Sequence, residues 1–389
     1  MPVSKAVNIS DLRKLARARL PNAIFDYLDG GAEDEWTLKE NERVFSDYIF
    51  RPRHGVHVGK PDLSVTVMGA RLAMPAFVAP IGYSRLIHPE GEMGAVRAAG
   101  RFGIAFAMST ISGYALEEIA SAATAPVFLQ IYLLAGRAAG EKTLDRAAAA
   151  GYKGLFLTVD TPVAGMRERD LRNGTRELMG PSLVAKLPYI ADVLAHPGWL
   201  MGYLSGGKMK TLPNVVMPDG AQFPLTDVAK ALETSVVTWD DLKWIRAQWK
   251  GPIAIKGILT GDDASRARDL GATAVVVSNH GGRQLDPVAS GMEALPEVVA
   301  AVGNDIEVLM DGGIRRGADI VKAMALGAKA VMLGRGYAYG MAAAGEKGID
   351  RALEIFQADL MRTLRLLGCK SVAELNSSYI QRRAFNSSP

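Results

Sequence analysis

Eight short apolar runs recur between residues 76 and 333, and alanine-rich segments with helical character separate most of them. Strands that alternate with helices are typical of a parallel sheet, and eight such units favour an α/β fold, the closed (β/α)8 TIM barrel. A doubly wound open sheet is the alternative, but no early run is followed by the glycine fingerprint GxGxxG of its dinucleotide-binding form. The runs lie at 76–79, 104–107, 127–131, 154–158, 253–255, 274–277, 306–310 and 330–333.

Two regions of the chain depart from this alternation. The first residues predict helices, with Ser10 as a candidate cap of the first one, and a long insertion follows the fourth run before a helix at 239–248 resumes the pattern. We expect one domain over 1–389. Its expected parts are N-terminal helices over 10–45, a barrel over about 76–345, an insertion over about 168–235 and C-terminal helices over about 346–380.

Composition excludes several classes of protein. A net charge of +4 in 389 residues is too small to indicate nucleic-acid binding, and the single Cys369 excludes an internal disulfide and any multi-cysteine metal site. We expect no metal. No stretch has the roughly 18 apolar residues that span a membrane, and the N-terminus lacks an apolar signal core, so a cytoplasmic location is expected.

The residues that follow the runs are the candidates for a functional site, because barrel active sites form at the carboxyl ends of the strands. The sixth run leads into SNHGGRQLD at 278–286, which offers the imidazole of His280 as a proton acceptor and Arg283 as a cation for a carboxylate. This pairing indicates a small anionic substrate, and a plain polar turn is the alternative. The other strand-end candidates are Pro80, Ile81, Gly82, Ser109, Gln130, Tyr132, Thr158, Asp160, Lys256 and Ser278.

Glycines and arginines follow the last two runs. DGGIRRG at 311–317 supplies Asp311, Gly313 and Arg315, and the eighth run is followed by Gly334 and Arg335. Glycines let backbone N–H groups approach an anion, and phosphate sites recur at this place in barrels. Tight turns would explain the glycines but not both arginines. We therefore expect a phosphate site, and a mononucleotide cofactor more than a dinucleotide.

Five segments together resemble the FMN-dependent (S)-2-hydroxy-acid dehydrogenases and oxidases, a family that includes flavin-type L-lactate dehydrogenase, mandelate dehydrogenase and glycolate oxidase. The resemblance covers about residues 10–380 and implies a barrel with FMN that oxidises an L-2-hydroxy acid to a 2-oxo acid. The segments are FDYLDGGAEDEWTLKEN at 25–41, LTVDTPVAGMRERD at 157–170, IKGI at 255–258, SNHGGRQLD at 278–286 and DGGIRRG at 311–317.

The resemblance also implies roles for individual residues. His280 would be the base, and Asp160 would stabilise its imidazolium. Arg283 and Arg167, the latter open to confusion with Arg169, would clamp the substrate carboxylate. The remaining implied contacts are Tyr27 and Tyr132 with the substrate, Lys256 beside flavin N1, Ser109, Gln130, Thr158 and Ser278 with the flavin ring, and the backbone of Pro80, Ile81 and Gly82 beside it.

Two positions depart from the oxidase pattern. Ile111 stands where glycolate oxidases have tryptophan, and Gly82 stands where oxidases of the family tend to have alanine. Glycine there favours a dehydrogenase that passes electrons to a quinone or another carrier. An oxidase or monooxygenase that uses O2 is the second possibility. A non-redox FMN or phosphate-binding barrel is a third, which the pairing of His280 with Arg283 disfavours.

Residues 181–210 of the insertion are apolar and slightly basic, with three lysines against one aspartate. Such a segment could lie in a membrane interface, and the resemblance points the same way. A lid over the substrate or packing against another subunit is the alternative. We expect peripheral binding to the inner face of a membrane, and the resemblance implies a homo-oligomer, with tetramers typical of the family.

Overall fold

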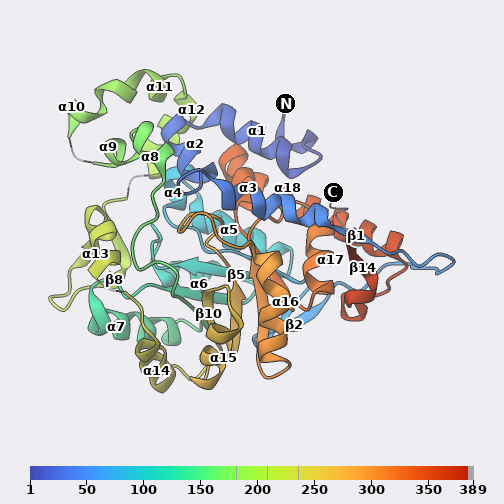
Figure 1. The fold of residues 1–389 in the computed structure, drawn as a ribbon. Helices are drawn as coiled ribbons and strands as arrows, with labels where there is room; N and C mark the ends of the chain where they lie inside the picture. Colours follow the sequence, from blue (N-terminus) through green and yellow to red (C-terminus); the bar gives the residue numbers. More distant parts are fainter. Residues whose placement is uncertain (181, 208, 235, 384–389) are drawn as a thin grey trace, which may run out of the picture.

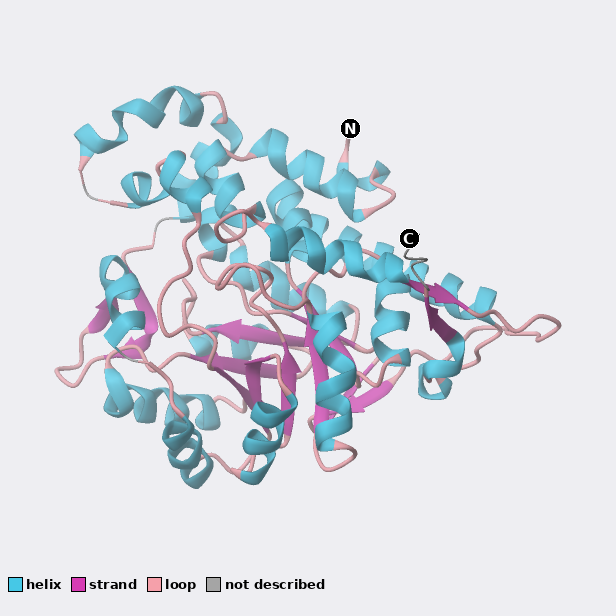
Figure 2. Cartoon of the chain, in the orientation of Figure 1, coloured by secondary structure: helices cyan, strands magenta, loops and turns pink. Residues whose placement is uncertain are grey.

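The computed structural model describes residues 1–180, 182–207, 209–234 and 236–383. Its centre is a closed barrel of eight parallel strands, and these strands are the eight predicted runs (Figures 1 and 2). The predicted (β/α)8 fold is therefore confirmed. In barrel order the strands are β4 (Ala76–Val78), β5 (Ala105–Ser109), β6 (Val127–Ile131), β7 (Gly154–Thr158), β10 (Ile253–Ile258), β11 (Ala274–Val277), β12 (Glu307–Asp311) and β13 (Ala330–Leu333).

Helices surround the barrel, and each buries an apolar face against the strands. The helix predicted at 239–248 is present with those bounds, so the alternation does resume after the insertion. The surrounding helices are α5 (Gly91–Arg101), α6 (Leu116–Ala122), α7 (Gly136–Ala149), α14 (Trp239–Gln248), α15 (Gly261–Asp269), α16 (Gly291–Val302), α17 (Gly317–Ala325) and α18 (Arg335–Leu367).

The interior of the barrel is filled with side chains and closed at one end. Phe77, Phe128 and Phe156 contact one another with ring centroids 5.3–5.8 Å apart. A hairpin of β2 (Val65–Val67) and β3 (Ala70–Leu72) packs onto the same cluster, and Met68 N donates to Glu307 at the start of β12. Since the hairpin covers the amino ends of the strands, the carboxyl ends are left for the site.

The N-terminal helices lie over the open end and the flank of the barrel. They are α1 (Ile9–Arg19), α2 (Asn22–Asp29) and α3 (Trp36–Arg43), with short 3-10 turns at Val3–Lys5 and Val44–Asp47. The cap of α1 is Asn8 rather than Ser10, because the Asn8 side chain accepts from Asp11 N at 2.8 Å. Ser10 already lies inside the helix.

The C-terminal region is less helical than expected over 346–380. Helix α18 contains a break at Ala344 and Gly345, and it ends at Leu367 because Gly368 adopts a left-handed conformation with φ of +69°. Two 3-10 turns follow, Val372–Glu374 and Ser377–Tyr379. Strand β14 (Ile380–Arg382) then pairs antiparallel with β1 (Tyr48–Phe50).

The insertion forms two groups of elements (Figure 1). One group lies at the upper left of the view, beside α2, and the other, with β8, β9 and α13, lies beside α7. Within the described residues, every helix is too short or too polar to cross a membrane. The elements are α8 (Glu168–Arg172), α9 (Thr175–Met179), α10 (Leu183–Lys186), a 3-10 turn (Leu187–Tyr189), α11 (Ile190–Leu194), α12 (Pro197–Gly202), a short π-helix (Tyr203–Gly207), β8 (Thr211–Val216), β9 (Gln222–Pro224), a 3-10 turn (Leu225–Asp227) and α13 (Val228–Thr234).

Candidate active site

A cavity opens at the carboxyl ends of the barrel strands, and side chains from all eight strand ends and from α2 line it. Asp160 and Ser278 lie one layer behind its wall, while the other predicted site residues face it. Those that line the cavity are Tyr27, Pro80, Ile81, Gly82, Ser109, Gln130, Tyr132, Thr158, Arg167, Lys256, His280, Arg283, Asp311, Gly313, Arg315, Gly334 and Arg335.

His280 and Asp160 form a hydrogen-bonded pair at the ends of β11 and β7. His280 Nδ1 lies 2.8 Å from Asp160 Oδ1, so Nε2 is the nitrogen left for a ligand. Burial raises the pKa of Asp160, but the attraction of His280 and its hydrogen bond, with the charge of Lys256, outweigh burial and lower it overall. The carboxylate therefore stays ionised next to a ring that can accept a proton.

Arg283 is a partly buried cation without a carboxylate partner among the described residues. Its Nη1 donates to the carbonyls of Tyr27 and Gly30, at 2.8 and 3.0 Å. Burial, with repulsion from Arg167, lowers the pKa of Arg283 to about 10. Carbonyl groups orient the guanidinium without neutralising it, so an anion that enters the cavity would gain its full attraction.

The two neighbouring arginines of the insertion have different positions. Arg167 lines the cavity and pairs with Asp170 at 2.9 Å. Arg169 instead bonds Asp29 at 3.0 Å and forms an ion pair with Glu35. Arg167 is therefore the one of the two that can reach a ligand in the cavity.

Two partly buried tyrosines face the same part of the cavity. Tyr27 OH donates to the carbonyl of Gly82 at 3.1 Å, and its ring meets the edge of Tyr83 with centroids 5.8 Å apart. Burial raises the pKa of Tyr27 and of Tyr132, and the charge of Asp160 adds to the effect at Tyr132. Both phenols therefore keep their protons and remain hydrogen-bond donors.

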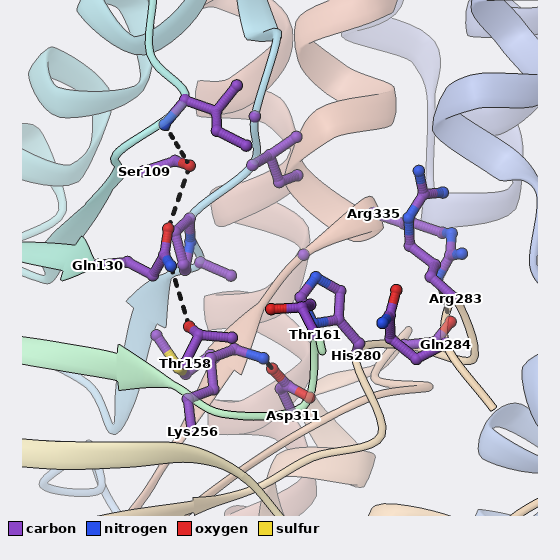
Figure 3. Close-up of a pocket in the computed structure, with 18 of the residues that line it drawn as sticks. Ser109, Gln130, Thr158, Thr161, Lys256, His280, Arg283, Gln284, Asp311 and Arg335 are labelled. Carbon is purple, nitrogen blue, oxygen red and sulfur yellow. Dashed lines mark hydrogen bonds and ion pairs between the residues drawn. The ribbon is translucent and has the colours of Figure 1, made fainter. Parts of the chain in front are cut away.

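A row of buried polar side chains runs across three adjacent strands on one side of the cavity (Figure 3). Ser109 Oγ donates to Gln130 Oε1 at 3.2 Å, and Gln130 Nε2 donates to Thr158 Oγ1 at 3.0 Å. The row presents hydroxyl and amide groups in a line inside an otherwise apolar barrel. Such an edge suits the heteroatoms of a flat polar ring.

Lys256 continues this row at the end of β10, where it pairs in register with Thr158 of β7. Its Nζ is 2.8 Å from Asp311 Oδ2 and donates to Ser278 Oγ at 2.8 Å. Burial lowers the pKa of Lys256, but the charges of Asp311 and Asp160 raise it by more. Asp311 Oδ1 is buried with no hydrogen-bond partner within the described chain, so the site has an acceptor left over.

The end predicted to hold phosphate is built from close backbone approaches. Gly312 and Gly313 have φ of +96° and +73°, and a Cβ on Gly313 would lie 1.7 Å from the carbonyl oxygen of Asn41. Only glycine fits such positions. The backbone of Gly334 has no heavy atom within 4 Å of where a Cβ would stand, which leaves open space.

The arginines of this end also hold other elements in place. Arg315 pairs with Glu42 at 2.8 Å. Arg335 donates to the carbonyls of Leu28, Gly281 and Gly30, at 3.1, 2.8 and 2.7 Å. Burial lowers the pKa of Arg335, which has no carboxylate partner among the described residues. Asp311 is paired with Lys256, and its carboxylate would repel a phosphate. The glycines and the two arginines are therefore the candidates for binding a phosphate.

Several lining residues had not been singled out from the sequence. Gln284 lies within the 278–286 motif, and Thr161 follows Asp160, so their motifs were a signal for both. Tyr83 follows the Pro80–Gly82 turn. Val228 and Leu232 belong to α13 of the insertion and had no such signal, since they are not at a strand end.

The family model and the individual relatives that match this chain point to the same family. A family model described as FMN-dependent dehydrogenase matches residues 16–382. The chain is 40% identical over 377 residues to the L-lactate dehydrogenase of Caulobacter vibrioides (strain NA1000 / CB15N), covering 96% of this chain and 97% of the relative. It is 39% identical over 376 residues to the (S)-mandelate dehydrogenase of Pseudomonas putida, covering 96% and 93%.

Two further matches bear on the branch of the family. The L-lactate oxidase of Nostoc sp. (strain PCC 7120 / SAG 25.82 / UTEX 2576) is 38% identical over 382 residues, covering 97% of this chain and 99% of that protein. The crystal structure of a monotopic membrane protein, (S)-mandelate dehydrogenase, superposes with a TM-score of 0.89 at 38% identity, covering 97% of this chain and all of that one.

Proposed function

The chain belongs to the FMN-dependent dehydrogenase family, whose named relatives act on 2-hydroxy acids, and on that basis we propose that it converts an L-2-hydroxy acid into the 2-oxo acid with His280 as the base. The observation that carries this proposal is the 2.8 Å pair of His280 and Asp160 in the same cavity as the unneutralised Arg283. A proton acceptor and a carboxylate-binding cation are what oxidation of such an acid requires.

The residues present fit FMN. The row of Ser109, Gln130 and Thr158 offers polar groups to a flat ring, and Lys256 offers a buried cation to the same region. The glycine backbones of 312–313 and 334, with Arg315 and Arg335, would hold its phosphate. When bound there, FMN supplies the acceptor for the two electrons that leave the substrate.

The chain's own residues bind and orient the acid. Arg283 and Arg167 would clamp the carboxylate, and the phenols of Tyr27 and Tyr132 would bond the substrate's oxygens, Tyr27 by exchanging its hydrogen bond to the Gly82 carbonyl for one to the substrate. His280 Nε2 takes the proton released when the alcohol becomes a carbonyl, while Asp160 stabilises the imidazolium that forms. In this proposal, substrate binding and proton removal belong to separate groups around one carbon.

The side group of the substrate would meet an apolar wall. Ile81, Tyr83, Ile111, Val228 and Leu232 line the cavity, and Ile111 packs in one cluster with Val228. Burial against such a wall costs a polar side group its hydrogen bonds to water, whereas an apolar side group has none to lose. We therefore propose a lactate- or mandelate-like acid.

The test is reduction of the purified yellow protein in the absence of oxygen. L-Lactate and (S)-mandelate are added separately, and bleaching of the flavin absorption is followed with D-lactate as the control. Bleaching by an L-acid supports the proposal. If no 2-hydroxy acid bleaches the flavin, the proposed reaction is wrong.

For the electron acceptor we propose a quinone or another carrier rather than O2. Gly82, the residue that favours a dehydrogenase, is packed closely against the Ile111 side chain, since a Cβ on Gly82 would lie only 3.3 Å from Ile111 Cβ. The 38% identical L-lactate oxidase keeps an oxidase as the second candidate. Mixing the substrate-reduced protein with air or with a soluble quinone decides between them. Faster reoxidation by air would contradict a dehydrogenase.

We also propose that the insertion binds the inner face of a membrane peripherally. Its apolar side chains Leu183, Val184, Leu187, Ile190, Leu194, Met201 and Leu204 are 40% to 78% exposed. Exposed apolar groups on short helices beside Lys186 and Lys210 suit an anionic lipid interface. Pro181 and Lys208 of the expected 181–210 segment lie outside the described residues. The similar mandelate dehydrogenase structure, titled monotopic membrane protein, agrees with this proposal.

Vesicle flotation tests the membrane proposal. A variant with Leu183→Ser, Leu187→Ser and Leu194→Ser should no longer float with vesicles that contain anionic lipid. The matched control is Leu366→Ser, since Leu366 is equally exposed but lies on α18, outside the insertion. If the triple variant floats like the wild type, the segment has another role, as a lid or a subunit contact.

Finally, we propose that the protein is a homo-oligomer. Trp36, Val163, Met166 and Leu285 are 48% to 66% exposed and come from three segments joined by hydrogen bonds, Glu33 N to Met166 O and Gln284 Nε2 to Val163 O among them. Such a cluster suits an interface between copies. Sedimentation analysis of the wild type and of Leu285→Glu tests this. A monomeric wild type would contradict the proposal.

A further inference from the structure

The side chain of Gln284 is bonded entirely to the backbone of one neighbouring segment. Its Nε2 donates to the carbonyls of Asp160 at 3.0 Å and Val163 at 2.8 Å, and its Oε1 accepts from Gly165 N at 3.2 Å. Although Gln284 lines the cavity, these three bonds occupy both amide hydrogens and the amide oxygen. The side chain therefore has little left to offer a substrate.

The two segments that Gln284 joins carry the two halves of the site. Gln284 itself follows His280 and Arg283 on the turn after β11, whereas the segment it binds carries Asp160 and leads to Arg167. Figure 3 shows Gln284 beside His280, with Thr161 on the other side of the ring. The Gln284 amide thus connects two parts of the site. One is the turn that carries His280 and Arg283, and the other is the strand end that carries Asp160.

The backbones of the two segments are also in direct contact. A Cβ on Gly165 would lie 2.2 Å from the carbonyl oxygen of Arg283 and 2.7 Å from the Cα of Gln284. Side-chain atoms therefore cannot separate the segments at this point. The position of one fixes the position of the other.

The carboxylate of Asp160 depends on this contact. Its Oδ1 bonds His280, and its Oδ2 has no hydrogen-bond partner within the described chain. Its orientation therefore rests on the backbone, which Val159 N ties to Lys256 O at 3.0 Å on one side and Gln284 ties at the Asp160 carbonyl. A loss of the second tie would let the carboxylate move away from Nδ1.

We propose that Gln284 is a positioning residue for the reaction, which holds Asp160 against His280 Nδ1; the proposal rests on the function proposed above. A misplacement of about 1 Å in such a site can cost roughly 100-fold in rate. Gln284 acts through Asp160, so its removal should weaken the support of the imidazolium without removing the base.

The experiment uses the flavin-loaded protein with Gln284→Met, which keeps the size of the side chain and removes all three bonds. We expect kcat/KM to fall about 10- to 100-fold while bound flavin is retained. The acidic limb of the kcat/KM pH profile should move to lower pH, because an imidazolium with weaker support loses its proton more easily. Gln248→Met is the matched control, since the Gln248 amide bonds Glu141 on the outer helices.

A double-mutant cycle separates positioning from a structural role. If Gln284 acts through Asp160, Asp160→Asn combined with Gln284→Met should be no slower than Asp160→Asn alone. The proposal would be overturned if the double variant lost the product of the two single losses in kcat/KM. It would also be overturned if the pH profile of Gln284→Met were identical to that of the wild type. Should Gln284→Met not fold, Gly165→Ala disturbs the same contact from the other side and should show the same shift and the same lack of additivity with Asp160→Asn.

The outcome is distinct from a failure of the proposed function. If no 2-hydroxy acid reduces the wild type, the function itself is wrong. If the wild type turns over and both Gln284→Met and Gly165→Ala behave like it, only the role of Gln284 is wrong.

Discussion

At the scale of single residues, two cations of the site, Arg283 and Arg335, are held by carbonyl groups and have no carboxylate partner among the described residues. Arg283 and Arg335 both donate to the carbonyl of Gly30, just past the end of α2. The carbonyl end of a helix carries a partial negative charge that attracts a cation but does not cancel it. Two partly buried guanidinium groups can therefore still attract an acid or a phosphate that enters the cavity.

His280→Gln should abolish nearly all turnover while the protein retains its flavin. Glutamine keeps the approximate size and polarity of the ring but cannot accept the proton, and loss of a general base costs roughly 100- to 10,000-fold. The measurement is anaerobic flavin reduction by the preferred acid, with flavin absorption as the control for folding. Reduction at the wild-type rate would remove His280 as the base.

At the scale of elements, helix α13 of the insertion completes the wall that surrounds the substrate's side group. Val228 and Leu232 are one turn apart on α13 and both line the cavity. Helix α13 belongs to a small core of its own, in which Val228 packs with Phe223 of β9, Val215 of β8 and Ile111 after β5. The insertion therefore shapes the cavity as well as the surface above it.

Leu232→Ala should favour acids with larger side groups. Removing three carbons from the wall enlarges the cavity beside Ile111, so kcat/KM for (S)-mandelate should rise relative to L-lactate by about 10-fold, within the range that one or two methylenes provide. The ratio of the two kcat/KM values is the measurement, with Leu225→Ala as the control, because Leu225 packs on the same small core without lining the cavity. An unchanged ratio would place the side group elsewhere.

The strands and most of their site residues could be predicted from the sequence, whereas contacts made by the insertion could not. Buried parallel strands are continuous apolar runs, so all eight could be recognised, and the strand-end rule led to Lys256 and His280. The same rule cannot find Leu232, which reaches the cavity from an insertion. It also grouped Asp311 with the phosphate end, whereas the ion pair places Asp311 with Lys256, which continues the row of Ser109, Gln130 and Thr158. An ion pair between β10 and β12, which are not adjacent strands, depends on tertiary geometry that the spacing of motifs does not contain.

At the scale of the whole molecule, one buried carboxylate joins three distant parts of the chain over the open end of the barrel. Asp29 of α2 bonds Arg13 of α1 at 2.6 Å, Arg169 of the insertion at 3.0 Å and Tyr339 of α18 at 2.7 Å. Burial raises the pKa of Asp29, but these partners lower it by more, and the net pKa is about 2. The network holds α2, and with it the carbonyls that bind Arg283 and Arg335, in place.

Asp29→Asn should remove a part of the stability that depends on pH. Because the pKa in the folded state lies below the unfolded value near 4, the stabilisation is present above pH 4 and is lost as the pH falls towards 2. A shift of this size corresponds to about 2 kcal/mol in the free energy of unfolding. Urea unfolding at pH 7 and pH 2.5 measures it. The difference between wild type and variant should be larger at pH 7, and an equal difference at both would contradict the network.

The pKa of Glu92 is shifted in the opposite direction to that of Asp29, so its effect on the pH dependence of stability has the opposite sign. It lies in the first turn of α5 and is buried; Ser112 and the backbone of Gly113 are near its carboxylate, but neither oxygen has a well-formed hydrogen bond within the described residues. Burial raises the pKa of Glu92 to about 7. The unfolded chain loses this proton near pH 4.5 and the folded chain near pH 7, so the stability of the fold decreases between these two values.

Glu92→Gln should therefore stabilise the protein at pH 8 and change little at pH 4.5. Glutamine resembles the protonated acid, so the two proteins are alike where Glu92 is neutral, and the variant avoids the cost of a buried charge where it is not. The gain at pH 8 should be on the order of 3 kcal/mol. Asp319, whose pKa burial raises to about 6, contributes a similar trend to both proteins and cancels in the difference. A variant that is less stable than the wild type at pH 8 would show that the ionised carboxylate has a partner that stabilises it.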